Sequence, residues 1–150
     1  MAKLSQKLTD LETEGGPVFT PRFLLAIVLA AVGIAWIAYY YAGARTGTPG
    51  QEHGIAFFRD LAGWNYLIGF GLFFLALLVS AHRSTPLGRG HGTVSAMLGC
   101  FIVGLAWIVV YYAAGDSIDK IWVFNDLAGK NLLVGIVFMA VGFAFAMRWE

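Results

Sequence analysis

The sequence predicts an all-α integral membrane protein with four transmembrane helices, arranged as two parallel-oriented two-helix repeats. Three observations predict this fold class. Only 13% of the 150 residues are charged, whereas ordinary soluble domains carry about 25%. The chain contains four uncharged apolar runs, each close to the ~20 residues that a helix needs to cross the hydrocarbon core. The two halves of the chain also resemble each other, so the expected helices occur in equivalent pairs.

The four apolar runs are the expected helices. None contains an acidic or basic residue or a histidine, and all are apolar on every side, which excludes the alternating pattern of transmembrane strands. The uncharged runs cover residues 23–44, 61–81, 93–115 and 131–147, and the helices expected from them cover approximately 23–44, 63–81, 93–115 and 130–147.

Two segments of the sequence each occur twice. "VGIAWIAYYYAGA" begins at residue 32, and "VGLAWIVVYYAAG" begins at residue 103. "DLAGWNYLIG" begins at residue 60 and returns as "DLAGKNLLVG" at residue 126. Each unit therefore consists of a helix, a loop, Asp-Leu-Ala-Gly and a second helix. With two helices per unit, both copies enter the membrane from the same side, as parallel repeats do.

The domain plan follows from these repeats. The N-terminal tail, which we expect to be flexible, covers residues 1–20. Repeat 1 covers residues 21–83, the linker covers residues 84–92, and repeat 2 covers residues 93–150. The tail, linker and C-terminus share one side and hold six of the ten Lys and Arg residues. Because cytoplasmic segments carry the excess of Lys and Arg, we expect a multi-pass plasma-membrane protein with both termini cytoplasmic.

The sequence contains no motif for catalysis, a cofactor or a metal. Its single cysteine and three histidines do not form a zinc-type cluster. Ser80 and Ser95 have no His or Asp within their own helices to activate them. A net charge of +1 gives no electrostatic case for nucleic acid. Helices without titratable groups argue against a pump or proton-coupled exchanger. We therefore expect a non-enzymatic protein without a cofactor, in contact with the lipid bilayer.

One aromatic pair recurs in the first helix of each unit. Trp36 and Tyr40 lie four residues apart and so on one helix face, and Trp107 and Tyr111 repeat them. Such a pair serves either as an interfacial aromatic belt with packing or as a face that binds a partner. The sequence leaves both interpretations open.

Polar and small residues also recur around the second helix of each unit. Asp60 and Asp126 precede these helices, where negative charge suits the positive helix end. Asn65 and Asn131 lie near the helix starts, where an asparagine bonds across helices or caps its own helix. Small residues four apart, which let helix backbones approach closely, are Ala76 and Ser80, then Gly142 and Ala146. We expect one four-helix bundle with pseudo-two-fold symmetry, joined through these small-residue faces.

The segments "VGLAWIVVYY" and "AGWNYLIGFG" and the ending "MRWE" resemble the CrgA family of actinobacterial cell-division proteins. Members are small two-helix membrane proteins with a WNY-type motif at the second helix. The likeness covers nearly all of both units, so the chain resembles a tandem CrgA. The WNY motif is intact as Trp64-Asn65-Tyr66, whereas the second unit has Lys130-Asn131-Leu132. The family usually begins with a basic tail, and this chain departs from that pattern with two lysines against three acids in residues 1–16.

The resemblance implies a non-catalytic component of the division machinery, enriched at septa, that coordinates division-ring assembly with septal peptidoglycan synthesis. The implied partners are division-ring and septal peptidoglycan synthesis membrane proteins, and a two-helix unit is also expected to self-associate. The family-signature or partner-contact candidates are Trp36, Trp64, Asn65, Tyr66, Trp107, Tyr111, Asn131, Arg148 and Trp149. The alternative is a small four-helix transporter or channel that uses the cleft between the repeats. Polar residues pointing into that cleft would favour it, and few are available.

Overall fold

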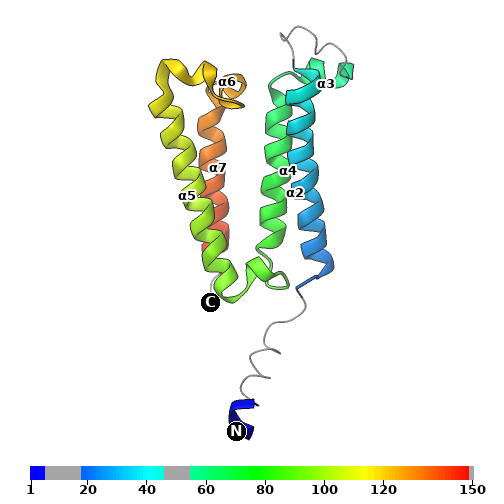
Figure 1. The fold of residues 1–150 in the computed structure, drawn as a ribbon, viewed down its shortest axis with the longest axis vertical. Coiled ribbons are helices and arrows are strands. Elements are labelled where there is room, and N and C mark those ends of the chain that lie inside the picture. The colour runs from blue at the N-terminus through cyan, green and yellow to red at the C-terminus, as the bar shows by residue number, and fades with distance from the viewer. Residues whose placement is uncertain (6–17, 46–54, 149–150) are drawn as a thin grey trace.

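The computed structural model describes residues 1–5, 18–45 and 55–148, and within these residues every regular element is a helix. Two helical hairpins lie side by side (Figure 1). One pairs α2 (Pro21–Tyr39) with α4 (Trp64–Ser80), and the other pairs α5 (Gly90–Ala114) with α7 (Lys130–Ala146). Each hairpin is one sequence unit. Most of the expected flexible tail, and Trp149, lie outside the described residues.

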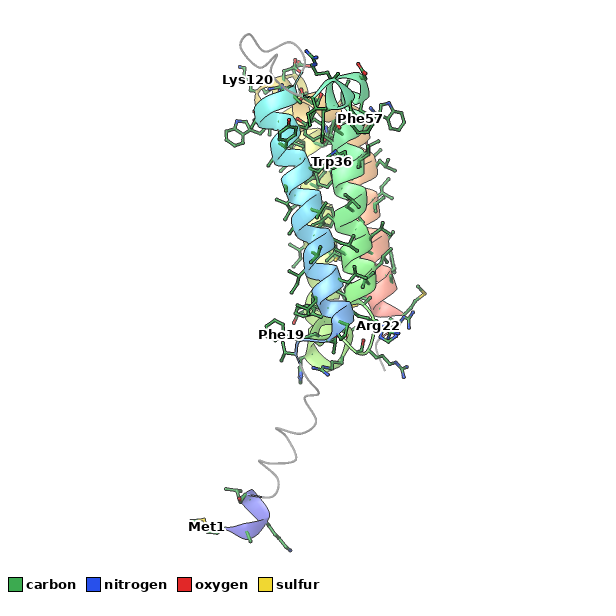
Figure 2. The ribbon with its side chains drawn as sticks, turned by 90° about the vertical axis from the view of Figure 1, so that its right-hand side faces the viewer. Met1, Phe19, Arg22, Trp36, Phe57 and Lys120 are labelled. Atoms are coloured by element: carbon green, nitrogen blue, oxygen red, sulfur yellow. The ribbon has the colours of Figure 1, made fainter. Side chains whose placement is uncertain are left out.

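The two ends of the bundle differ in structure. At the loop end, short helices connect the long ones: a π-helical turn η1 (Tyr40–Ala44), α3 (Ala56–Leu61), a 3-10 helix η3 (Gly115–Lys120) and α6 (Phe124–Leu127). The opposite end, called the linker end, carries the turn from α4 to α5 and the end of α7. Figure 2 shows Trp36, Phe57 and Lys120 near the loop end and Phe19 and Arg22 near the linker end.

The outer surface of the bundle is apolar. Pro21–Ala44 and Gly90–Lys120 are long and apolar enough to cross a membrane. The other two long helices, α4 and α7, are also apolar but have 17 residues each, which corresponds to a length of about 26 Å. Large side chains such as Val28, Leu75, Ile102 and Phe143 are exposed on the four helices. A continuous apolar exterior of this kind is stable in lipid and unstable in water.

Each hairpin crosses at a pair of glycines. A β-carbon added at Gly33 would lie 2.6 Å from the carbonyl oxygen of Gly69, and one added at Gly104 would lie 2.8 Å from that of Gly135. Side chains do not tolerate such distances, so only glycine permits the backbones to approach this closely. The four glycines occupy equivalent positions in the repeated segments. The repeat therefore encodes the same crossing twice.

The small residues singled out in the sequence lie inside the hairpins. A β-carbon at Gly142 would lie 3.2 Å from the ring of Phe101 on α5. Ala76 and Ser80 are buried and border a small space beside α2, and Ala146 is half-buried. Gly142, Ala76 and Ser80 therefore pack within their units, against the first helix of their own hairpin.

The junction between the hairpins is made by aromatic rings instead. Phe74 on α4 and Phe138 on α7 meet edge-to-face, with ring centroids 4.8 Å apart, and Phe73 also contacts Phe138. The structure thus differs from the expectation that the second and fourth helices join through small residues. With these bulky rings between them, α4 and α7 approach each other less closely than the two helices within each hairpin do.

The turn between the hairpins is compact and hydrogen-bonded. It covers residues 81–89 rather than the expected 84–92, because α5 begins at Gly90 instead of Thr93. The buried Thr85 hydroxyl donates to the carbonyl oxygens of Ser80 and His82 and accepts from the Gly88 N–H. A side chain at residue 92 would strike this turn, so glycine lets the first turn of α5 fold against it.

Replacing Gly104 with alanine should destabilise the α5–α7 hairpin, because the added methyl group would press on the carbonyl oxygen of Gly135. We expect the free energy of unfolding in bicelles to fall by about 1–3 kcal/mol, as overpacking usually costs. Gly99→Ala is the matched control in the same helix, since a β-carbon there meets nothing within 4 Å. Equal effects of the two substitutions would contradict the glycine crossing.

Candidate functional site

One carboxylate joins the two units at the loop end. Asp126 Oδ1 accepts a 2.7 Å hydrogen bond from Arg45 Nη2, and its Oδ2 accepts a 2.7 Å bond from the Tyr66 hydroxyl. Arg45 follows the first helix of unit 1, and Tyr66 lies in its second helix. Asp126 of unit 2 therefore binds both helices of unit 1 at once.

The surroundings of Asp126 strengthen these bonds. The Asp126 and Arg45 side chains are only 20% and 23% exposed, so water screens the ion pair incompletely. The hydrogen bond to Asp126 raises the pKa of the Arg45 guanidinium above its ordinary value. The guanidinium also lies 5.2 Å from the ring centroid of Tyr41, and the buried Tyr66 ring meets Tyr40 edge-on at 5.1 Å. Hydrogen bonds to charged groups contribute about 1.5–3 kcal/mol each.

Asn65 fixes the start of α4 in unit 1. Its Nδ2 donates to the carbonyl oxygens of Phe58 and Ala62, at 2.6 and 2.8 Å, and its Oδ1 accepts from Trp36 Nε1 at 3.3 Å. Ala62 has a φ of 42°, a costly conformation for a residue other than glycine. Asn65 thus bonds across helices and also holds the strained turn ahead of its own helix.

Asn131 makes the same two backbone bonds in unit 2, each 2.8 Å long, to Phe124 and Ala128. Unit 2 lacks the third bond, the one from the tryptophan side chain to the asparagine. Trp107 Nε1 and Asn131 Oδ1 are both buried without a partner among the described residues. Trp107 instead stacks on Phe124, with centroids 4.4 Å apart and ring planes 22° from parallel. The two units therefore share a framework and differ in this tryptophan contact.

Trp64 and Lys130 begin α4 and α7 and meet across the junction of the units. The Lys130 Nζ lies 4.8 Å from the Trp64 ring centroid, which is within the ~6 Å range of a cation–π interaction. Trp64 is nevertheless 60% exposed. The two residues occupy equivalent positions in the repeat, so the lysine that replaces the second WNY tryptophan covers part of the first.

The remaining signature residues lie apart from this cluster. Tyr111 is half-buried beside Tyr112, with ring centroids 5.3 Å apart. Arg148 is exposed at the linker end. The sequence interpretation assigned Asp126 a helix-end role and did not assign Arg45 any role. The sequence feature that could have indicated a role for Arg45 is its position, because it is a charged residue directly after an apolar run.

The described residues contain no group of three or more His, Cys, Asp or Glu side chains that could hold a metal ion. The family is identified by a match that covers the chain twice: the model for "Cell division protein CrgA" matches residues 5–83 and again residues 88–150. The chain belongs to the CrgA family. It is a tandem-duplicated member, with one CrgA unit per helical hairpin.

Two CrgA relatives illustrate the similarity. The cell division protein CrgA of Streptomyces avermitilis is 36% identical over 64 residues, which are 43% of this chain and 71% of that protein. That of Corynebacterium aurimucosum is 33% identical over 76 residues, which are 47% of this chain and 80% of that protein. Most of each relative thus corresponds to less than half of this CrgA chain. No solved structure gives a significant match.

Asp126→Asn should separate the loop ends of the two CrgA units, because the amide keeps the shape of the carboxylate but lacks its charge. We expect the free energy of unfolding to fall by about 1.5–3 kcal/mol, as for a lost hydrogen bond to a charged group. Asp60→Asn is the matched control, since Asp60 is the exposed equivalent of Asp126 in unit 1. If unfolding in bicelles shows the same change for both variants, Asp126 does not join the units.

Proposed function

We propose that this chain is a non-catalytic membrane adaptor of the division machinery, which brings division-ring and septal peptidoglycan synthesis proteins together. The observation that carries the proposal is the CrgA match over both units, with relatives named cell division proteins. A cell-division role follows from the family. The adaptor role is our extension of it.

The surface of the bundle supports binding to other proteins. At the loop end, Phe57, Trp64 and Trp122 are 56%, 60% and 75% exposed. Exposed aromatic side chains are enriched where proteins bind one another, because they bury a large area with few rotatable bonds. The Asp126 contacts fix the positions of the segments that carry these rings. The two units in one chain would then present their exposed aromatic rings to partners in a constant arrangement.

A transporter that uses the cleft between the repeats receives less support. The spaces beside the α4–α7 junction are lined by apolar side chains such as Leu67, Phe74, Val137 and Val103. A path for a polar substrate would require polar groups there. We therefore favour the adaptor.

We further propose that all four long helices cross the plasma membrane, with both termini and the linker in the cytoplasm. The 17-residue helices α4 and α7 reach the lower limit of about 17–25 residues for a span. Aromatic residues at the loop end would lie at the membrane interface, where their amphipathic rings are favoured.

The topology is testable by cysteine labelling in a Cys100→Ala background. A cysteine at Ser117, at the loop end, should react with an impermeant thiol reagent in intact cells. A cysteine at Ser84, in the linker, should react only after the cells are opened. The reverse pattern would invert the orientation, and labelling of both sites in intact cells would exclude the four-span arrangement.

The adaptor role is testable by locating a fluorescent fusion and recovering its partners from membranes. We expect septal enrichment of the wild type and a several-fold lower recovery of septal peptidoglycan synthesis proteins with Trp64→Ala. Phe143→Ala is the matched control, because this ring is 59% exposed, close to the 60% of Trp64, but lies on α7 outside the loop end. Uniform distribution of the wild type, with no division protein recovered, would favour the transporter.

A further inference from the structure

An apolar groove runs along the junction of the two units. It lies between α4 and α7, has a volume of about 420 Å³, and is bordered by Leu67, Gly71 and Leu78 on α4 and by Leu133 and Val137 on α7. Leu78 and Leu133 are 45% and 49% exposed, so the groove opens to the surroundings of the bundle. This volume falls within the range of about 300–1,000 Å³ that is typical of small-molecule sites.

A cation lies at one end of this groove. Trp64 precedes Leu67 by three residues, and Lys130 precedes Leu133 by three, so both lie above the groove on the faces that line it. The Lys130 Nζ is 4.8 Å from the Trp64 ring centroid. A β-carbon added at Gly63 would lie 3.6 Å from the same Nζ, so the ammonium group reaches across the junction to unit 1. The nearby Asp126 carboxylate is already bound by Arg45.

The dimensions of the groove match one leaflet of a bilayer. From Leu67 to Leu78 the helix rises about 16 Å, and half of the hydrocarbon core is about 15 Å thick. Trp64 and Lys130 would then lie at the level of the lipid headgroups, where tryptophan and lysine side chains are favoured. The groove begins directly below them.

We propose that this groove binds one anionic phospholipid from the leaflet at the loop end. Its acyl chain lies between α4 and α7, and its phosphate group contacts the Lys130 ammonium beside Trp64. The inference rests on the membrane-embedded arrangement proposed above and is independent of the adaptor role.

An acyl chain fits the groove better than a second helix does. A helix about 10 Å wide fills more than about 1,000 Å³ over a length of 16 Å, well beyond the volume of the groove. A helix would therefore rest on the groove and leave its floor empty. The Lys130 ammonium at the mouth also complements a phosphate group, whereas an apolar helix face offers it no partner.

The test is native mass spectrometry of the full chain in mild detergent, incubated with equal amounts of phosphatidylglycerol and phosphatidylcholine that have the same acyl chains. We expect one bound lipid, with phosphatidylglycerol preferred by about fivefold, which corresponds to the ~1 kcal/mol contribution of a lysine near anionic lipid. Lys130→Gln should bring the preference close to one while lipid remains bound. Lys120→Gln is the matched control and should keep the preference, because Lys120 lies in η3, away from the groove.

A second pair of variants tests the groove itself. Gly71→Leu should abolish binding of both lipids, because its side chain would occupy the groove, and a β-carbon there meets nothing within 4 Å. Gly99→Leu is the matched control, at an equally open glycine that borders a separate space between α4 and α5. Circular dichroism melts check that both variants fold. Equal lipid binding by Gly71→Leu and wild type, or an unchanged headgroup preference in Lys130→Gln, would overturn the proposal. So would a dimer that Gly71→Leu dissociates, which would identify a second copy as the occupant.

Discussion

The close approach of two helix backbones at a glycine pair is the constraint on which each half of this protein depends. Gly33 meets Gly69 in unit 1, and Gly104 meets Gly135 in unit 2. Helices in lipid gain little from burying apolar surface, since the lipid is apolar too, so they associate where small residues permit dense packing. One turn from the crossing towards the loop end of unit 1, this approach lets Trp36 of α2 donate a hydrogen bond to Asn65 of α4.

The two units have kept their internal structure and diverged where they meet. Both retain the glycine crossing and the asparagine that holds the Asp-Leu-Ala-Gly turn. At the junction, Arg45 and Tyr66 of unit 1 bind Asp126 of unit 2. Unit 1 also has the equivalent aspartate, Asp60, but unit 2 has Asp116 and Leu132 where unit 1 has Arg45 and Tyr66, so the reverse contact has no donors. A symmetric pair of identical units would place the same groups on both sides. Because the two sequences have diverged after duplication, the contact forms in one direction only, from unit 1 donors to the unit 2 carboxylate.

The helices were predictable from the sequence because length and composition determine them locally. An uncharged apolar run of about 20 residues has few alternatives to a helix in lipid. The ion pair between Arg45 and Asp126 was not predictable, because it depends on how one unit lies against the other. Helical periodicity describes faces within one helix and carries no such information. Gly104 was available as a signal, since it recurs with Gly33 at the same place in both repeats. The small residue Gly142 does pack against another helix, but the sequence does not show that this helix is α5 of its own hairpin.

The compact turn of residues 81–89 has a consequence for how the protein depends on its own abundance. Two binding modules joined by a short connection meet at an effective concentration in the millimolar range, whatever the number of molecules present. In a single-unit protein, pairing rises and falls with expression and with dilution in the membrane. In this chain the two hairpins stay paired even in a cell that contains one copy.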